Sequence, residues 1–291
     1  MKRILSLALF IVLILPFSGC SIPTDSAQIA ATTLPVYTFT QWLCKDTGLT
    51  VERLIHQEIS CVHDETLSVQ QVRLLESADV VILSGGGLED YMDAALKKAH
   101  SVIDSSDGLE LIACDHDHDH DHHHEADPHF WLSPIHAKAM VQNICRGLKA
   151  QYPQFAEDFD RNLAALEEEL DKLLLYGREQ LSSLATRKLI TFHDGFSYFA
   201  HAFDLTILEA LEEDTHTTAS AAQLISLITL VREHRLPAVF TEKNGSSSAA
   251  GIVCAETGIS AYALDMAISG EDYFTAMYHN IHTIQEALGC T

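Results

Sequence analysis

Histidine and acidic side chains are concentrated in one short tract, residues 115–125. Asp and His alternate from Asp115 to His122, and two further His residues and Glu125 complete the tract. Deprotonated imidazole and carboxylate groups both bind divalent transition metals. The tract has no apolar residue that a core would bury, so we expect a mobile loop. Its histidines are the candidates for an auxiliary metal-binding loop: His116, His118, His120, His122, His123 and His124. Its internal position argues against an expression tag, and a passive solvated linker is the remaining alternative.

The first twenty residues have the pattern of an export signal. Lys2 and Arg3 precede an apolar run over residues 4–15, which is too short to span a membrane as a helix. Ser18-Gly19-Cys20 resembles the end of a bacterial lipobox, although Phe17 stands where Leu is usual. We therefore predict a lipoprotein signal peptide over residues 1–20 and a lipid on Cys20. An ordinary signal peptide with a nearby cleavage site is the alternative.

The charge of the chain restricts its partners. The formal net charge is −23, with only 18 Lys and Arg residues. Such an acidic chain is not expected to bind nucleic acid or an anionic membrane surface, so we expect contact with the membrane only through the lipid anchor. An exported protein can form disulfides, and we expect one between Cys254 and Cys290. The pairing of the other cysteines cannot be predicted: Cys44, Cys61, Cys114 and Cys145.

Short apolar runs alternate with helical patterns in both halves of the chain. Expected strands are 29–33, 51–55, 80–83 and 101–103 in the first half, and 189–192, 206–208, 238–241 and 261–264 in the second. Expected helices are 37–45, 68–76 and 88–99, then 196–203, 219–234, 247–257 and 272–288. This alternation is typical of parallel sheets with helices on both faces. We therefore predict an α/β protein with two lobes, each a mostly parallel sheet with flanking helices.

A long amphipathic segment separates the two halves. Between residues 153 and 183, Phe and Leu recur at three- and four-residue spacing, and Glu167, Glu168 and Glu169 occupy the other face. Pro153 suits the first turn of a helix. A helix of about 30 residues would be about 45 Å long, so we predict a rigid helix that joins both lobes.

Four residues occupy positions where ligands bind in such folds. His63, His193 and Asp265 each follow an expected strand, and ligands of open α/β sheets bind beyond the carboxyl ends of the strands. His129 follows the acid-imidazole tract. His63 and His129 belong to the first half, and His193 and Asp265 belong to the second. We therefore expect the four side chains to converge across a cleft between the lobes.

The motifs around these residues resemble a known family, the metal-specific solute-binding lipoproteins of ABC importers of the ZnuA/TroA type. The segments that carry the resemblance lie in the family's order: 61–68 with 78–81 and 86–89, Asp127-Pro128-His129-Phe130-Trp131-Leu132, Phe192-His193-Asp194-Gly195-Phe196, 240–242, 256–258, Leu264-Asp265 and Asp272-Tyr273. Three positions depart from the family pattern, because Val62 and Met266 replace Pro and Ser133 replaces Asp. These departures affect loops more than metal ligands.

The resemblance implies both the domain organisation and the function. It implies an N-terminal lobe over 21–152 that includes the loop 115–125, a linker helix over 153–185 and a C-terminal lobe over 186–291. It implies that His63, His129, His193 and Asp265 bind metal, with Asp265 the least secure. It also implies an extracytoplasmic monomer that delivers the metal to an importer permease, at the cell surface or in the periplasm.

The ligand set favours zinc. Three imidazoles and one carboxylate suit Zn²⁺, whereas Mn²⁺ prefers more oxygen ligands. A manganese-binding homologue, a stand-alone metal buffer and an adhesin remain alternatives. A zinc hydrolase is disfavoured because the chain has no His-Glu-x-x-His helix and no Gly-x-Ser-x-Gly elbow. We therefore expect a binding protein rather than an enzyme.

Overall fold

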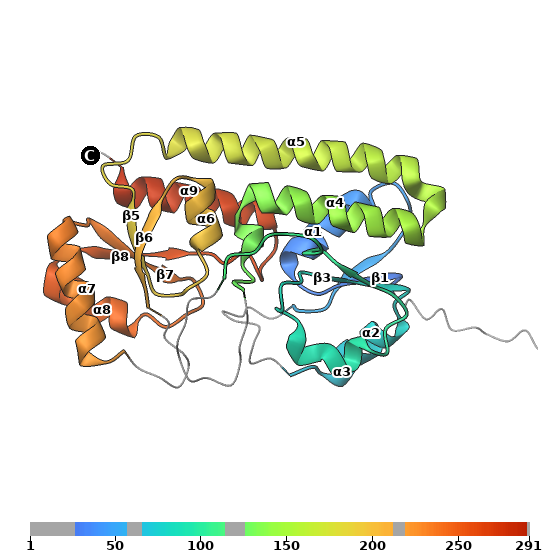
Figure 1. The fold of residues 1–291 in the computed structure, drawn as a ribbon, viewed down its shortest axis with the longest axis horizontal. Coiled ribbons are helices and arrows are strands. Elements are labelled where there is room, and N and C mark those ends of the chain that lie inside the picture. Colours follow the sequence, from blue (N-terminus) through green and yellow to red (C-terminus); the bar gives the residue numbers. More distant parts are fainter. Residues whose placement is uncertain (1–26, 57–65, 114–125, 212–218, 290–291) are drawn as a thin grey trace, which may run out of the picture.

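The protein contains two parallel β-sheets, one in each half of the chain (Figure 1). The computed structural model describes residues 27–56, 66–113, 126–211 and 219–289. The first sheet has the order β2-β1-β3-β4 and the second the order β6-β5-β7-β8. The strands are β1 (Ile29–Ala31), β2 (Val51–Arg53), β3 (Val80–Leu83), β4 (Val102–Asp104), β5 (Lys188–Thr191), β6 (Thr206–Ala210), β7 (Ala238–Glu242) and β8 (Ser260–Leu264).

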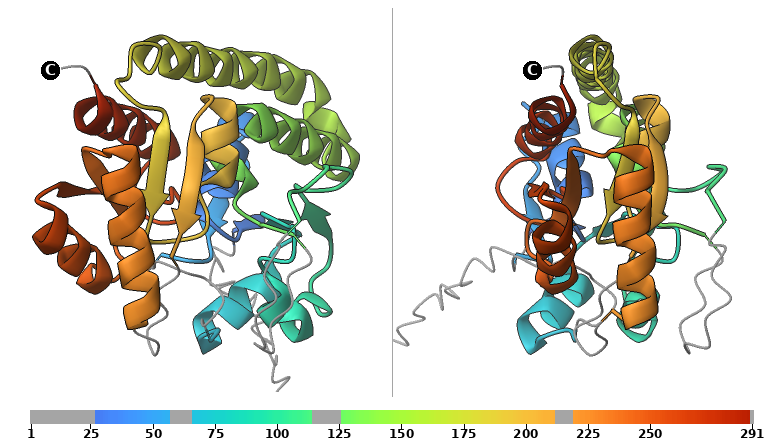
Figure 2. Two further views of the ribbon diagram at one scale, coloured as in Figure 1. Left: turned by 60° about the vertical axis from the view of Figure 1, so that its left-hand side comes forward. Right: turned by 90° about the vertical axis from the view of Figure 1, so that its left-hand side faces the viewer.

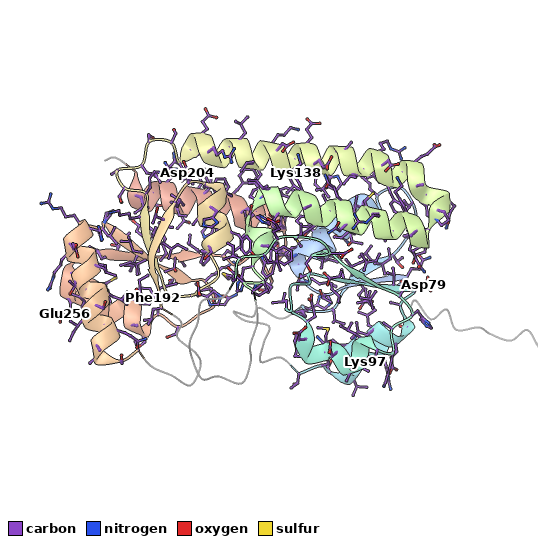
Figure 3. The ribbon with its side chains drawn as sticks, in the orientation of Figure 1. Asp79, Lys97, Lys138, Phe192, Asp204 and Glu256 are labelled. Carbon is purple, nitrogen blue, oxygen red and sulfur yellow. The ribbon has the colours of Figure 1, made fainter. Side chains whose placement is uncertain are left out.

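All the strand pairs are parallel, which confirms the predicted fold class. Strands β1, β3 and β7 are buried along their whole length. β1 and β3 are uninterrupted apolar runs, and β7 is apolar from Ala238 to Phe240, as expected for strands that are covered on both faces. Side chains fill the layers between these sheets and the helices around them (Figure 3).

The helices confirm most of the predicted pattern. They are α1 (Leu34–Leu43), α2 (Val69–Ser77), α3 (Asp93–Leu96), α4 (Pro134–Gln151), α5 (Ala156–Gln180), α6 (Ser197–Ala202), α7 (Ala221–His234), α8 (Ser248–Thr257) and α9 (Tyr273–Leu288). Short 3₁₀ turns are η1 (Asp90–Met92), η2 (Phe130–Leu132) and η3 (Pro153–Phe155). Ser68 and Ser220 form capping boxes that define the starts of α2 and α7.

Two helices differ from the prediction. The helix expected over 88–99 is reduced to η1 and α3, and α3 has no buried side chain. The two buried apolar residues of this segment, Leu88 and Met92, lie before α3, and Ala95 and Leu96 within α3 are only half-buried, so little packing stabilises a longer helix. Helix α4 was not predicted. Its start was readable in the sequence, because the Ser133 side chain accepts the His136 N–H and Pro134 occupies the first turn.

Helix α5 joins the two lobes as predicted. It has 25 residues and is therefore about 38 Å long. It contacts α1 and α4 of the N-terminal lobe and α9 of the C-terminal lobe, and it runs along both lobes in Figure 1 and in the left-hand view of Figure 2. Leu166, Leu170 and Leu173 are fully buried. At Gly177 an added Cβ would lie 2.2 Å from the Phe203 ring, so glycine permits the close approach of α5 to the C-terminal lobe.

The segment after β8 is held against the N-terminal lobe. The indole N–H of Trp131 donates to the Met266 carbonyl at 2.8 Å, and Arg53 donates to the Gly270 carbonyl at 2.7 Å. The Tyr273 hydroxyl donates to the Trp131 carbonyl at 2.7 Å. One hydrophobic cluster contains buried residues of both lobes, for example Val81 and Phe240. The two lobes therefore form a continuous core behind the edge where ligands are expected.

Three cysteines are free thiols in the described part of the chain: Cys44, Cys145 and Cys254. The expected bond between Cys254 and Cys290 stays a prediction, because one of its two residues is not described. Cys290 itself, like Cys20, Cys61 and Cys114, lies outside the described residues. Burial raises the pKa of Cys44 to about 12 and that of Cys145 to about 11, so both thiols stay protonated and unreactive. Within the described ranges, no helix is long and apolar enough to cross a membrane.

Candidate metal centre between the lobes

His129 is held in place by the acid two residues before it. The residue is buried. Asp127 Oδ1 accepts two hydrogen bonds, one from the His129 backbone N–H at 2.9 Å and one from Nδ1 of the ring at 2.8 Å. Because a carboxylate only accepts, Nδ1 carries the proton. The Trp131 ring lies edge-on at 5.4 Å between centroids. Such a carboxylate–imidazole pair orients a ring so that Nε2 can bind metal.

His193 follows β5 and has a similar acidic neighbour. It is also buried, and its Nδ1 lies 3.6 Å from Oε2 of Glu242, the last residue of β7. This distance is longer than a hydrogen bond, and the carboxylate lies on the Nδ1 side of the ring. Because β5 and β7 are neighbours in the sheet, their carboxyl ends bring His193 and Glu242 together.

Gly195 leaves space beside the His193 ring. A Cβ at residue 195 would lie 2.9 Å from Cδ2 and 3.0 Å from Nε2 of His193, and 2.5 Å from Cε of Met266. Any other side chain would press on the ring and on the buried thioether. The glycine of the His193-Asp194-Gly195 motif is therefore a steric requirement of the site.

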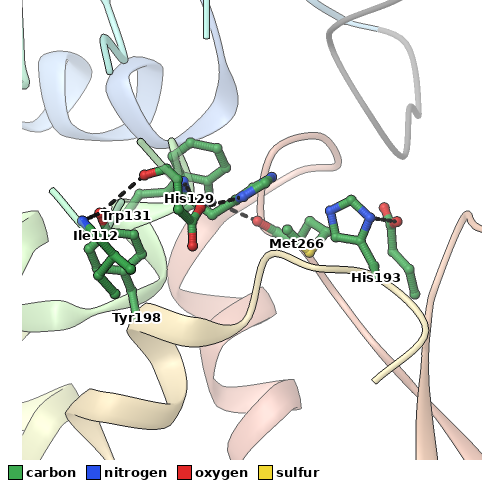
Figure 4. A network of polar contacts seen from close by, with 8 residues as sticks. Ile112, His129, Trp131, His193, Tyr198 and Met266 are labelled. Carbon is green, nitrogen blue, oxygen red and sulfur yellow. Dashed lines mark hydrogen bonds and ion pairs between the residues drawn. The ribbon is translucent and has the colours of Figure 1, made fainter. Parts of the chain in front are cut away.

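The structure brings His129 and His193 together. Their ring centroids are 5.3 Å apart and the ring planes are nearly perpendicular, at 85° (Figure 4). One ring comes from the N-terminal lobe and the other from the C-terminal lobe. The sequence predicted this convergence for four side chains, and the described residues show it for these two.

Asp265 follows β8 as predicted, but it is not gathered with the two imidazoles. Its Oδ2 lies 3.1 Å from the Lys243 ammonium, and its Oδ1 accepts the Ala267 N–H at 2.8 Å. No group of three or more His, Cys, Asp or Glu side chains that could hold a metal occurs in the described part of the chain. His63 and the tract 115–125, with His116, His118, His120, His122, His123 and His124, lie outside the described residues.

A third buried acid, Glu89, organises the carboxyl edge of the N-terminal sheet. Its Oε1 accepts the Thr32 hydroxyl at 2.6 Å and the Ser84 N–H at 2.8 Å, and its Oε2 accepts the Gly85 N–H at 2.9 Å. Burial raises the pKa of Glu89 to about 7, although these three hydrogen bonds lower it. At Gly85, φ is 87° and a Cβ would lie 1.9 Å from Asp104 Oδ1. This turn therefore requires glycine.

Three functional neighbours were missed in the sequence: Asp127, Glu242 and Lys243. Asp127 had a local signal, because an acid two residues before a histidine in a turn can reach its ring. Glu242 lies in the segment 240–242 that carries the resemblance, but nothing local places it beside His193, and Lys243 had no signal. They meet His193 and Asp265 only through the order of strands in the sheet.

Comparison with known proteins places the chain in a family. The family described as "Zinc-uptake complex component A periplasmic" matches residues 29–287. The zinc-binding lipoprotein AdcA of Streptococcus pneumoniae is 30% identical over 278 residues, which cover 89% of this chain and 55% of AdcA. The chain thus spans about half the length of that relative. The high-affinity zinc uptake system protein ZnuA of Bacillus subtilis is 28% identical, and the alignment covers 91% of this chain and 88% of that protein.

Solved structures agree with this relationship. A crystal structure of ZnuA matches with a TM-score of 0.80 at 26% identity, over 91% of this chain and all of the other. The Zn(II)-bound ZnuA-like domain of S. pneumoniae AdcA matches with a TM-score of 0.75 at 27% identity, over 90% of this chain and 98% of that domain. The chain therefore belongs to the zinc-uptake complex component A family.

Proposed function

We propose that this chain is the extracytoplasmic zinc-binding component of an ABC importer. It captures Zn²⁺ between its lobes and delivers the ion to a membrane permease. The observation that carries this proposal is the buried pair His129 and His193, contributed by opposite lobes and each faced at Nδ1 by a carboxylate. Two oriented imidazoles in a closed, buried setting suit a borderline metal such as zinc.

His63 and Asp265 complete the proposed ligand set. Nδ1 of His129 and of His193 faces an acid, so Nε2 is the proposed ligand atom of each ring. Asp265 supplies Oδ2, the oxygen that now faces Lys243. Three nitrogens and one oxygen fill a tetrahedral zinc site and leave no open position for a reactive water. The site would therefore bind and release zinc without catalysis.

The names of relatives support the same function. The pneumococcal relative is named as a zinc-binding lipoprotein and the Bacillus relative as part of a high-affinity zinc uptake system. We infer by similarity that this chain is exported, anchored through a lipid on Cys20 and active as a monomer beside its permease. The tract 115–125 would gather zinc weakly near the cleft.

Zinc titration tests this proposal. The full chain should hold one zinc ion against a strong chelator, and His193→Ala should lose that ion by removing one of four ligands. Tyr262→Ala, at a half-buried position on β8, is a control that should keep the tight site. Equal or tighter retention of Mn²⁺ under the same conditions would favour a manganese-binding homologue. Failure to retain any metal would contradict the proposal.

A further inference from the structure

Lys243 and Asp265 form an ion pair at the carboxyl edge of the C-terminal sheet. Lys243 directly follows β7, and its backbone N–H donates to the Leu264 carbonyl at 2.8 Å. This bond continues the pairing of β7 with β8 and places the lysine beside Asp265. The distance between Nζ and Oδ2 is 3.1 Å. We propose that Lys243 is a built-in competitor of zinc for the Asp265 carboxylate, which limits affinity and speeds release. This inference rests on the proposed role of Asp265 as a zinc ligand.

The Asp265 backbone cannot move away from this position. Its N–H donates to Oδ1 of Asn280 and its carbonyl accepts from Nδ2 of the same side chain, both at 2.7 Å. Asn280 is fully buried on α9. The strand end is therefore fixed, and only the Asp265 side chain remains to exchange partners.

One of the two carboxylate oxygens is also fixed. Oδ1 accepts the Ala267 N–H at 2.8 Å, in a turn that holds Ala267 at a φ of 52°. Oδ2 is left as the oxygen that can bind a cation, and Lys243 occupies that position. A zinc ion and an ammonium group on the same oxygen repel each other. Zinc binding through Oδ2 is therefore weakened while Lys243 stays and is favoured when it leaves.

Lys243 is suited to leave and return. Its side chain is 53% exposed, whereas that of Asp265 is 16% exposed. The ammonium can move into water with little loss of solvation, while the carboxylate stays in place. When zinc departs, the lysine neutralises the carboxylate again and opposes rebinding. Ion pairs with one exposed partner contribute little net free energy, so we expect the lysine to change zinc affinity only about three- to tenfold.

The other acid near this strand end has a separate partner. Glu242 precedes Lys243, and alternation along the strand points the two side chains in opposite directions. Glu242 faces Nδ1 of His193 at 3.6 Å. The effect of Lys243 should therefore act through Asp265 and not through the imidazole.

Chelator competition on the full chain tests the inference, with the chelator chosen to report only the tightest zinc site. Lys243→Gln should tighten binding about three- to tenfold and slow dissociation. Lys172→Gln is the matched control, because the Lys172 side chain is 54% exposed and pairs with Glu168 and Glu169 on α5. This substitution changes the net charge by the same amount as Lys243→Gln. It should alter affinity less than about twofold.

A double variant separates the inference from the proposed function. In Asp265→Asn, which should itself bind zinc more weakly, Lys243→Gln should give no further gain. A gain that persists in Asp265→Asn, or a gain no larger than that of Lys172→Gln, would overturn the competitor role. If the unaltered chain surrenders all its zinc to the chelator, the proposed function fails instead, before any lysine variant is compared.

Discussion

The imidazole rings of His129 and His193 lie edge to face with their centroids 5.3 Å apart. The two residues belong to different lobes, and both are buried at 7% exposure. Two buried imidazoles at this separation suit the proposed metal site, because little conformational entropy would be lost when a metal joins them.

Removing the charge of Asp127 should weaken zinc binding. Asp127→Asn keeps an acceptor for the backbone N–H of His129 but replaces the carboxylate that binds Nδ1. Loss of such a partner typically reduces metal affinity about 10- to 100-fold. Chelator competition measures the change. Asp171→Asn on α5, whose side chain is 57% exposed, is the control and should bind zinc like the unaltered chain. Equal affinities for the two variants would remove Asp127 from the site.

Gly195→Ala should displace the His193 ring. The added Cβ would lie 3.0 Å from Nε2 and 2.9 Å from Cδ2 of His193. These distances are so short that the ring or Met266 must shift. We expect a loss of about 1–3 kcal/mol in stability from overpacking, and zinc affinity reduced at least tenfold because Nε2 moves. Gly251→Ala is the control, because nothing lies within 4 Å of its added Cβ. It lies inside α8 and should stabilise the fold by about 0.5–1 kcal/mol without changing zinc affinity. Unchanged zinc binding in Gly195→Ala would show that the ring position does not matter.

Zinc affinity should fall steeply below about pH 6. Imidazole binds metal only in its neutral form, and the ordinary pKa of the group is about 6.5. Protons and zinc therefore compete for the same nitrogen atoms. Chelator competition at pH 5 and pH 7.5 measures the effect. The tract 115–125 should lose its zinc before the cleft does, because it contains no apolar residue whose packing could preorganise its ligands. Constant affinity across this interval would mean that imidazoles are not the ligands.

Glu89 should make the metal-free protein less stable as the pH rises from about 4.5 to about 7. Burial raises its pKa from 4.5 to about 7, so the folded state holds the proton more tightly than the unfolded state. Its contribution is complete below the unfolded pKa and is lost as the pH rises through the folded pKa. The loss is on the order of 3 kcal/mol. Urea unfolding at pH 5 and pH 7.5 should show a smaller decline in Glu89→Gln. Parallel pH profiles would contradict this role.

Deleting residues 115–125 should leave the tight zinc site intact. The tract contains only acidic residues and histidines, so no packing would preorganise its ligands and zinc binding would cost conformational entropy, whereas the proposed ligands His193 and Asp265 follow strand ends. The deletion should remove weakly bound zinc in a calorimetric titration and slow growth only when zinc is scarce. Loss of the tight phase would place the tract among the primary ligands. An unchanged weak phase and unchanged growth would instead make it a passive linker.

The sequence by itself determined the elements and the chemistry of the protein. Local periodicity predicted both sheets and the long helix, because strands and helices bury apolar residues at different intervals. Residue type and position after a strand singled out His193 and Asp265. Two elements were harder: α3 is much shorter than the helix predicted there, because it buries little, and α4 was missed although Ser133-Pro134 is a start signal.

Only the tertiary structure decided which of these side chains meet. His129 and His193 are neighbours because the long helix and the buried segment after β8 fix one lobe against the other. Glu242 and Lys243 face His193 and Asp265 because β7 lies between β5 and β8. No local pattern encodes that order. Contacts between distant residues depend on the combined geometry of every element between them, and this is why the sequence could name ligands but could not give their partners.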